Sequence, residues 1–138
     1  MLYNNVERLT DAQARDLEVL YQQEWWTQGR SLEDVRSMLE NPGYLYGTCE
    51  PETGKLVGFA RVLSDGVFKA LVFDVIVDQA HRGRAIGRQL MERILADSRL
   101  SRVKHVELYC LPELEPFYES LGFSSNVGDL RLMRLETR

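Results

Sequence analysis

The sequence predicts a mixed α/β fold in which a mostly antiparallel sheet carries helices on both faces. Apolar residues recur every three to four positions in three segments, which is typical of helices that pack on one side. Segments rich in β-branched and aromatic residues lie between them, bounded by turn residues, and these are typical of strands. The order of the segments and the length of 138 residues predict a single domain over 1–138.

Two helices are expected before residue 44. Thr10 and Gln13 have the spacing of a capping box, so the first helix is expected over 11–25. Ser31 has the residue type of a second N-cap and is followed by acidic residues in the first turn. This second helix is expected to stop at the Asn-Pro-Gly sequence at 41–43, because proline cannot continue a helix.

The remaining segments are expected to build the sheet and cover its second face. They are strands at 44–48, 55–63, 67–77 and 103–110, a helix at 83–97, a short helix from Pro116 to the C-cap Gly122, and closing strands at Phe123 and 130–135. The run at 67–77 is nearly continuous in apolar residues, which predicts a central strand buried on both faces.

Composition excludes several classes of protein. The 17 basic and 21 acidic residues give a formal net charge of −4, which argues against a basic nucleic-acid-binding face and is compatible with a cationic substrate. Cys49 and Cys110 are interpreted as free thiols of a reducing cytosol, and no Cys/His spacing suits a metal. No apolar run is long enough to cross a membrane, and the first residues do not form a signal-peptide pattern. We therefore expect a cytoplasmic protein without a metal.

The segment at 74–91, DVIVDQAHRGRAIGRQLM, has the character of an anion site. A buried strand runs into a turn that opens a helix, and the first N–H groups of a helix lack internal partners. Small residues and arginines share this turn: Arg82, Gly83, Arg84, Ala85, Gly87 and Arg88. Small residues admit a phosphate to the backbone, and arginines add charge-assisted hydrogen bonds. A diphosphate-bearing ligand is favoured over the alternative of a merely solvated turn, although neither a P-loop nor a Rossmann fingerprint is present.

The same stretch resembles the acetyl-CoA-binding signature of the GNAT superfamily of N-acetyltransferases, [Q/R]-x-x-G-x-[G/A]. Arg82, Ala85 and Gly87 fill its defined positions, with Ala85 in place of the usual glycine. FYESLGF at 117–123 resembles the common FYxxLGF ending of that family. The resemblance implies a sheet splayed at its central strand, and transfer of an acetyl group from acetyl-CoA to a primary amine by direct attack in a ternary complex.

Specific residues follow from this resemblance. The backbone of Val75, Ile76 and Val77 would hold the pantetheine arm, and the N–H groups from Gly83 through Ile86 to Arg88 would hold the diphosphate. Tyr118 matches the tyrosine that donates a proton to the departing thiolate, and a phenol stays protonated at neutral pH. The alternative for Tyr118 is a core aromatic residue. Leu111 stands where many members carry an asparagine that contacts the CoA arm.

The general base and the acceptor site are less defined. The candidate bases are Asp74, inside the apolar strand, and Glu107, on the next strand. The alternative for each is a structural ion pair. Glu24, Trp25 and Trp26 are candidates for an amine pocket, although at least one tryptophan is expected to cap the core. Arylalkylamines, polyamines, amino sugars and protein amines all remain open as the amine substrate.

Two rival functions are compatible with the sequence. One is a non-catalytic acyl-CoA sensor or interaction module on the same fold, and the other is a binder of a different phosphorylated ligand. No nucleic acid or membrane partner is expected. A homodimer formed through the C-terminal strands is compatible with the habit of the family.

Overall fold

The structure is a computed structural model that describes residues 2–41 and 43–137, so Pro42 of the expected helix stop lies outside the described residues. The chain forms two compact units, Met1–Leu108 and Tyr109–Arg138, and each is described by itself. Within the described residues, no helix is long and apolar enough to cross a membrane.

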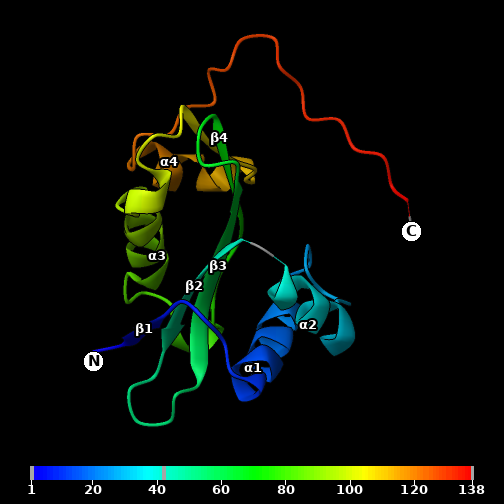
Figure 1. Cartoon of the computed structure of the whole chain (residues 1–138), viewed down its shortest axis with the longest axis vertical. Coiled ribbons are helices and arrows are strands. Elements are labelled where there is room, and N and C mark those ends of the chain that lie inside the picture. Colours follow the sequence, from blue (N-terminus) through cyan, green and yellow to red (C-terminus); the bar gives the residue numbers. More distant parts are fainter. Residues whose placement is uncertain (1, 42, 138) are drawn as a thin grey trace. The chain divides into compact units, whose positions relative to one another are not determined.

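The first unit contains a five-stranded sheet in the order β1-β2-β3-β4-β5 (Figure 1). The strands are β1 (Asn4–Val6), β2 (Tyr44–Cys49), β3 (Leu56–Ser64), β4 (Lys69–Val77) and β5 (His105–Leu108). Neighbouring strands are antiparallel except β4 and β5, which are parallel. The expected mixed, mostly antiparallel sheet is therefore confirmed, and β1 is an additional edge strand that the sequence did not indicate.

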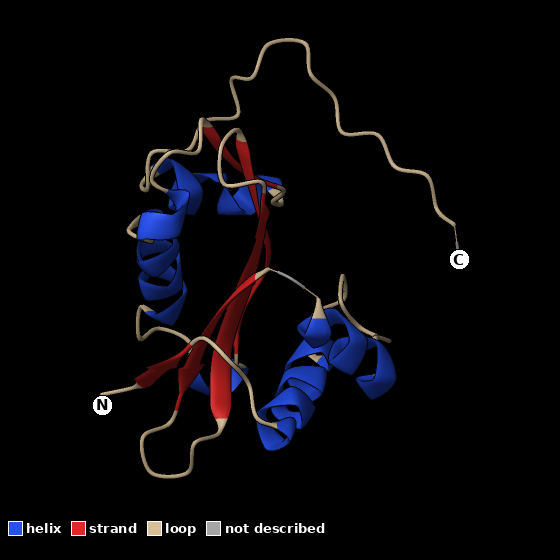
Figure 2. Ribbon diagram, viewed as in Figure 1, coloured by secondary structure: helices blue, strands red, loops and turns tan. Residues whose placement is uncertain are grey.

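Three helices pack on this sheet, one pair on one face and a single helix on the other. They are α1 (Asp11–Gln22), α2 (Leu32–Glu40) and α3 (Ile86–Leu95). Figure 2 shows α3 along one face and α1 with α2 against the opposite face, which confirms helices on both faces. The capping box of α1 is confirmed, because Gln13 N donates to Thr10 Oγ1 at 3.1 Å and Thr10 N donates to Gln13 Oε1 at 3.0 Å.

The core fixes where α1 and α3 lie on the sheet. On one face Leu17 and Tyr21 of α1 pack with Phe59 of β3, all fully buried. On the other face α3 approaches β3 closely at Gly58, where an added Cβ would lie 2.6 Å from Ile86 Cγ2. A side chain at Gly58 would push the start of α3 outward, so this glycine sets the position of the turn that precedes the helix.

Strand β4 differs from the expected continuously buried strand. Its side chains alternate between buried and half-buried, and a β-bulge interrupts its pairing with β3. Arg61 pairs with Phe73 and Phe59 pairs with Ile76, so one extra β4 residue is accommodated at Asp74, which has a φ of 56°. A bulge of this kind changes which face the next side chains point to. The bulge brings Asp74 to the α1 face, where it contacts Arg61.

The second unit contains one short helix, α4 (Glu115–Glu119), which includes Pro116 in its first turn as expected. The helix ends two residues before the expected end, and Gly122 follows with a φ of 99°. The expected closing strands at Phe123 and 130–135 are wrong, since residues 120–137 form no strand. Alternating apolar residues form a strand only where a neighbour supplies the ladder of hydrogen bonds, and the described residues of this unit contain no strand.

Candidate functional site

The turn between β4 and α3 presents a row of unpaired backbone N–H groups. The first hydrogen bond of α3 runs from Gln89 N to Ala85 O, at 3.0 Å. Among the described residues, the N–H groups from Gly83 to Gly87 make no backbone hydrogen bond. Five successive free donors at the positive end of a ten-residue helix have the electrostatic character that favours an anion. This is the stretch expected to hold a diphosphate.

Two left-handed residues shape this turn. Gly83 has a φ of 80°, and Ala85, the N-cap of α3, has a φ of 62° and a ψ of 21°. Glycine adopts this conformation freely, whereas a residue with a Cβ is strained in it. The geometry therefore gives a physical reason for glycine at this position of the GNAT signature, and the alanine here adopts the same conformation at a cost.

Replacing Ala85 by Gly is expected to raise the unfolding free energy by about 0.5–1 kcal/mol. The left-handed conformation costs an alanine about 1–2 kcal/mol, which glycine does not lose. Glycine also has greater freedom in the unfolded chain, and this lowers the gain in unfolding free energy by about 0.4–1 kcal/mol. Urea denaturation measures the change. Ala96→Gly is the control, because Ala96 is right-handed with a φ of −94° and its replacement should destabilise the protein. If Ala85→Gly instead lowers the unfolding free energy, the claim that Ala85 is strained is wrong.

Side chains from distant segments hold the turn in place. Arg82 Nη2 lies 2.5 Å from Glu24 Oε1, and Arg84 Nη1 donates to the Tyr3 hydroxyl at 3.0 Å. That hydroxyl lies 2.8 Å from Nδ1 of the buried His81. The sequence did not indicate Tyr3 or His81, although His81 lies within the signature stretch. Arg88 lies in the first turn of α3 and is half-buried.

One edge of β4 beside this turn has no strand paired to it within the first unit, and we call it the open edge. The parallel pairing of β4 with β5 ends at Val72 and Leu108, so the segment 73–77 has no partner on β5. Val75, Ile76 and Val77 belong to this segment, and on the other edge Ile76 and Val77 pair with β3. An extended ligand arm can therefore hydrogen-bond to this edge as an added strand would.

Asp74 is the centre of a buried ionic cluster. Its Oδ2 accepts hydrogen bonds from Tyr21 Oη at 2.9 Å, Arg30 Nη1 at 2.9 Å and Arg61 Nε at 2.7 Å. Burial alone would raise the pKa of the Asp74 carboxyl, but the hydrogen bonds from Arg30 and Arg61 outweigh burial and lower that pKa. Burial and the adjacent carboxylate raise the pKa of Tyr21.

This cluster favours the structural alternative for Asp74. A carboxylate that accepts three hydrogen bonds on one oxygen, two of them from guanidinium groups, is a weak proton acceptor. Tyr21, Arg30 and Arg61 were not indicated by the sequence, because they lie 53, 44 and 13 positions from Asp74. The other candidate base, Glu107, is half-exposed, and its Oε1 pairs with Lys69 Nζ at 2.9 Å.

The residues expected to form the amine pocket lie just beyond the end of α1. Trp25 is 71% exposed and Trp26 is 39% exposed, so the expectation that at least one caps the core is wrong. The chain leaves the helix at Gln22 and continues in turns through this segment, and both tryptophans remain exposed there. Glu24 carries the ion pair to Arg82, which ties this segment to the turn between β4 and α3.

Tyr118 lies on α4 in the second unit and is buried. Its ring makes edge contacts with Phe117 and Phe123, at centroid distances of 4.9 Å and 6.0 Å. Burial raises the pKa of Tyr118 to about 12, and Cys110 adds to that shift. The phenol therefore carries its proton throughout the neutral range.

Three further sequence features have a place in the structure. Cys49 is buried and Cys110 is exposed, and both are free thiols. Leu111 is half-buried and precedes a short 3-10 turn at Pro112–Leu114. Among residues 2–41 and 43–137, no three His, Cys, Asp or Glu side chains are grouped to hold a metal ion.

Comparison with known proteins agrees with this geometry. A serotonin N-acetyltransferase 2, chloroplastic, of Oryza sativa subsp. japonica is 38% identical over 106 residues, which are 75% of this chain and 53% of the relative. The chain therefore spans about half the length of that curated relative.

Solved structures share the fold over nearly the whole chain. A protein described as belonging to the GNAT family, from Xanthomonas campestris pv. campestris, superposes with a TM-score of 0.83 at 24% identity, covering 99% of this chain and 94% of that chain. Glucosamine-6-phosphate N-acetyltransferase from Arabidopsis thaliana has a TM-score of 0.77 at 19% identity, covering 98% and 99%. The sequence also matches the Acetyltransferase (GNAT) family over residues 6–123. Because this match spans most of the sequence, the chain belongs to the GNAT family of acetyltransferases.

Proposed function

We propose that this chain transfers an acetyl group from acetyl-CoA to a primary amine. The observation that carries the proposal is the row of free N–H groups from Gly83 to Gly87, located next to the open edge of β4. A diphosphate needs several converging donors, and an amide-containing arm needs an unpaired strand edge. The chain supplies both in consecutive segments.

The proposed roles follow the chemistry of the residues. Acetyl-CoA supplies the activated thioester, and the amine nitrogen forms the new N–C bond as the C–S bond breaks. Tyr118 gives its proton to the leaving sulfur, a role that its pKa of about 12 suits because the group stays protonated. The amine loses one proton, which we assign to Glu107 or to water rather than to Asp74, because Asp74 is held by two arginines.

Calorimetric titration with acetyl-CoA, followed by a thiol-release assay, tests the proposal. We expect a Kd on the order of 1–100 μM, within the range of working substrate affinities, and release of CoA thiol with at least one amine of a broad panel. No detectable binding at millimolar acetyl-CoA would contradict the proposal. Binding without thiol release from any amine would instead favour a non-catalytic acyl-CoA sensor, and competition by plain CoA would show that binding does not require the acetyl group.

A further inference from the structure

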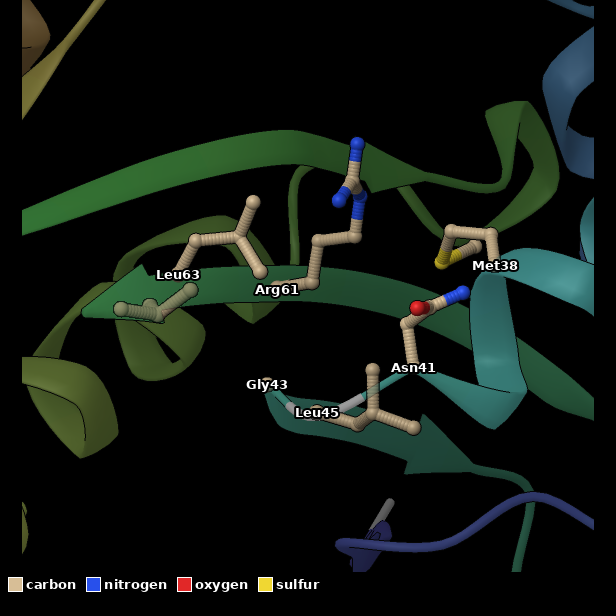
Figure 3. A pocket seen from close by; sticks show the side chains of 7 residues that line it. Met38, Asn41, Gly43, Leu45, Arg61 and Leu63 are labelled. Atoms are coloured by element: carbon tan, nitrogen blue, oxygen red, sulfur yellow. The ribbon is translucent and has the colours of Figure 1, made fainter. Parts of the chain in front are cut away.

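A pocket of about 420 Å³ lies on the face of the sheet that carries α1 and α2, beyond the end of α2. Its lining residues are Met38, Asn41, Gly43, Leu45, Arg61, Val62 and Leu63. Figure 3 shows the Arg61 side chain extending away from β3, with Leu63 beside it on the same strand and Met38 across from it on α2. The volume suits a small molecule, since ligand pockets commonly measure about 300–1,000 Å³.

Arg61 is the single charged residue among those that line the pocket. Its Nε donates to Asp74, and within the described residues its two terminal nitrogens make no hydrogen bond. The side chain is 19% exposed, so these donors are largely shielded from water yet open toward the pocket. A shielded guanidinium with unused donors is a strong binding group for a carboxylate or phosphate.

The cluster behind the pocket carries an excess positive charge. Arg30 and Arg61 share the one carboxylate of Asp74, which leaves one positive charge uncompensated within the cluster. No lining residue of the pocket is acidic. The pocket therefore attracts an anion and disfavours a polycation, because a second positive charge in this partly dry site would lack a partner.

Arg61 is the lining residue nearest to the open part of β4, because it pairs with Phe73, whereas Val62 and Leu63 pair with Val72 and Leu71, which β5 covers. Asp74, which binds Arg61, directly precedes Val75, the first of the residues assigned to the pantetheine arm. A ligand anchored by its anion at Arg61 is therefore held at the end of the pocket that lies nearest to this part of the strand.

From these contacts we infer that the acceptor is a small primary amine that bears a carboxylate or phosphate, and that Arg61 binds this anionic group. The inference rests on the proposed acetyl transfer, and it narrows the acceptor classes left open by the sequence. The apolar walls formed by Met38, Leu45 and Leu63 pack against the carbon skeleton of the amine. Polyamines are excluded as preferred acceptors, since they bring only positive charge.

Thiol-release kinetics with matched pairs of amines test this inference. Phenylalanine against phenethylamine probes a carboxylate, and glucosamine 6-phosphate against glucosamine probes a phosphate. We expect the anionic member of at least one pair to have a kcat/KM about ten-fold higher or more, as befits a charge-assisted contact. The pair that shows the difference identifies which anion the site takes.

Two charge-matched variants assign the effect to the pocket. Leu63→Glu places a carboxylate at a pocket position that is 40% exposed, and Leu95→Glu adds the same charge at an exposed position of α3. We expect Leu63→Glu to remove the preference for the anionic amine and Leu95→Glu to keep it. Arg61→Lys should retain part of the preference and Arg61→Gln should lose it, with the Kd of acetyl-CoA unchanged in both.

Direct binding separates failure of this inference from failure of the proposed function. Calorimetry with phenylalanine and with glucosamine 6-phosphate measures the anion site without any transfer step. Binding that is lost in Leu63→Glu but kept in Leu95→Glu supports the site, even if no amine is acetylated and the proposed function fails. The inference is overturned if acetyl transfer has equal kcat/KM for the anionic and the neutral amine of each pair. It is also overturned if Leu63→Glu and Leu95→Glu show the same preference. Neither result contradicts the proposed function.

Discussion

Replacing Tyr118 by Phe is expected to lower kcat for acetyl transfer by about 10²–10⁴-fold, the usual contribution of a positioned general acid. Phenylalanine keeps the aromatic contacts with Phe117 and Phe123, so the fold and the Kd of acetyl-CoA should be preserved. Thiol-release kinetics and calorimetry on the same preparation measure both quantities. Tyr44→Phe on β2 is a matched control that should leave kcat unchanged. An unchanged kcat in Tyr118→Phe would remove this residue from the acid role.

The raised pKa of Tyr118 gives the same role a signature in the pH dependence. A general acid is active while it is protonated, so its contribution is present below its pKa and is lost as the pH rises through about 12. Loss of the Tyr118 proton should therefore cause no fall in kcat between pH 7 and about 10. If kcat of the wild-type protein falls between pH 7 and about 10 and kcat of Tyr118→Phe does not, Tyr118 has a much lower pKa than its burial implies.

Replacing Asp74 by Asn is expected to lower the unfolding free energy by about 2–3 kcal/mol. Removing one partner of a buried ion pair costs about 3–5 kcal/mol, and the partial exposure of Arg30 reduces that figure. Asparagine tolerates the left-handed φ of 56° and keeps the side-chain shape, so the loss reports on charge. Urea denaturation at pH 7 measures it, with Asp129→Asn at an exposed position as the control.

The dependence of stability on pH checks the same ion pairs. The pKa of Asp74 is lower in the folded protein than its usual value of 3.8, so its stabilising contribution is present above that value. The contribution is lost as the pH falls below 3.8 toward the folded pKa. The wild-type protein should therefore lose more stability than Asp74→Asn over this range. Asp97 has a lowered pKa as well, through its hydrogen bonds with Arg99 and Tyr46, and it contributes equally in both proteins. Parallel stability curves would contradict the role of Asp74 in the cluster.

The sequence by itself determined the local features of this protein. The capping box of α1, the N-cap Ser31 of α2 and the apolar stripe of α3 each depend on residues within one or two turns of each other. The free N–H groups of the turn before α3 could be predicted for the same reason, because unpaired N–H groups follow from where a helix begins. Its resemblance to the GNAT signature indicates the family without any knowledge of tertiary contacts.

Only the tertiary structure decided the surroundings of Asp74. Its carboxylate looked like a base from its place in an apolar run, but Arg30 and Arg61 reach it from other elements and make it an ion-pair partner. The bulge that brings Asp74 to the α1 face depends on the register of two strands, which local sequence patterns do not encode.

Exposure and pairing were decided in the same way. Whether Trp25 is covered depends on the path of the chain beyond α1, and whether 130–135 forms a strand depends on a partner strand. The pocket at Arg61 is formed jointly by α2, β2 and β3, so it exists only once these elements pack. Periodicity and caps act over a few residues, whereas ion pairs, registers and pockets join residues far apart in the chain, and that difference separates what the sequence determined from what packing decided.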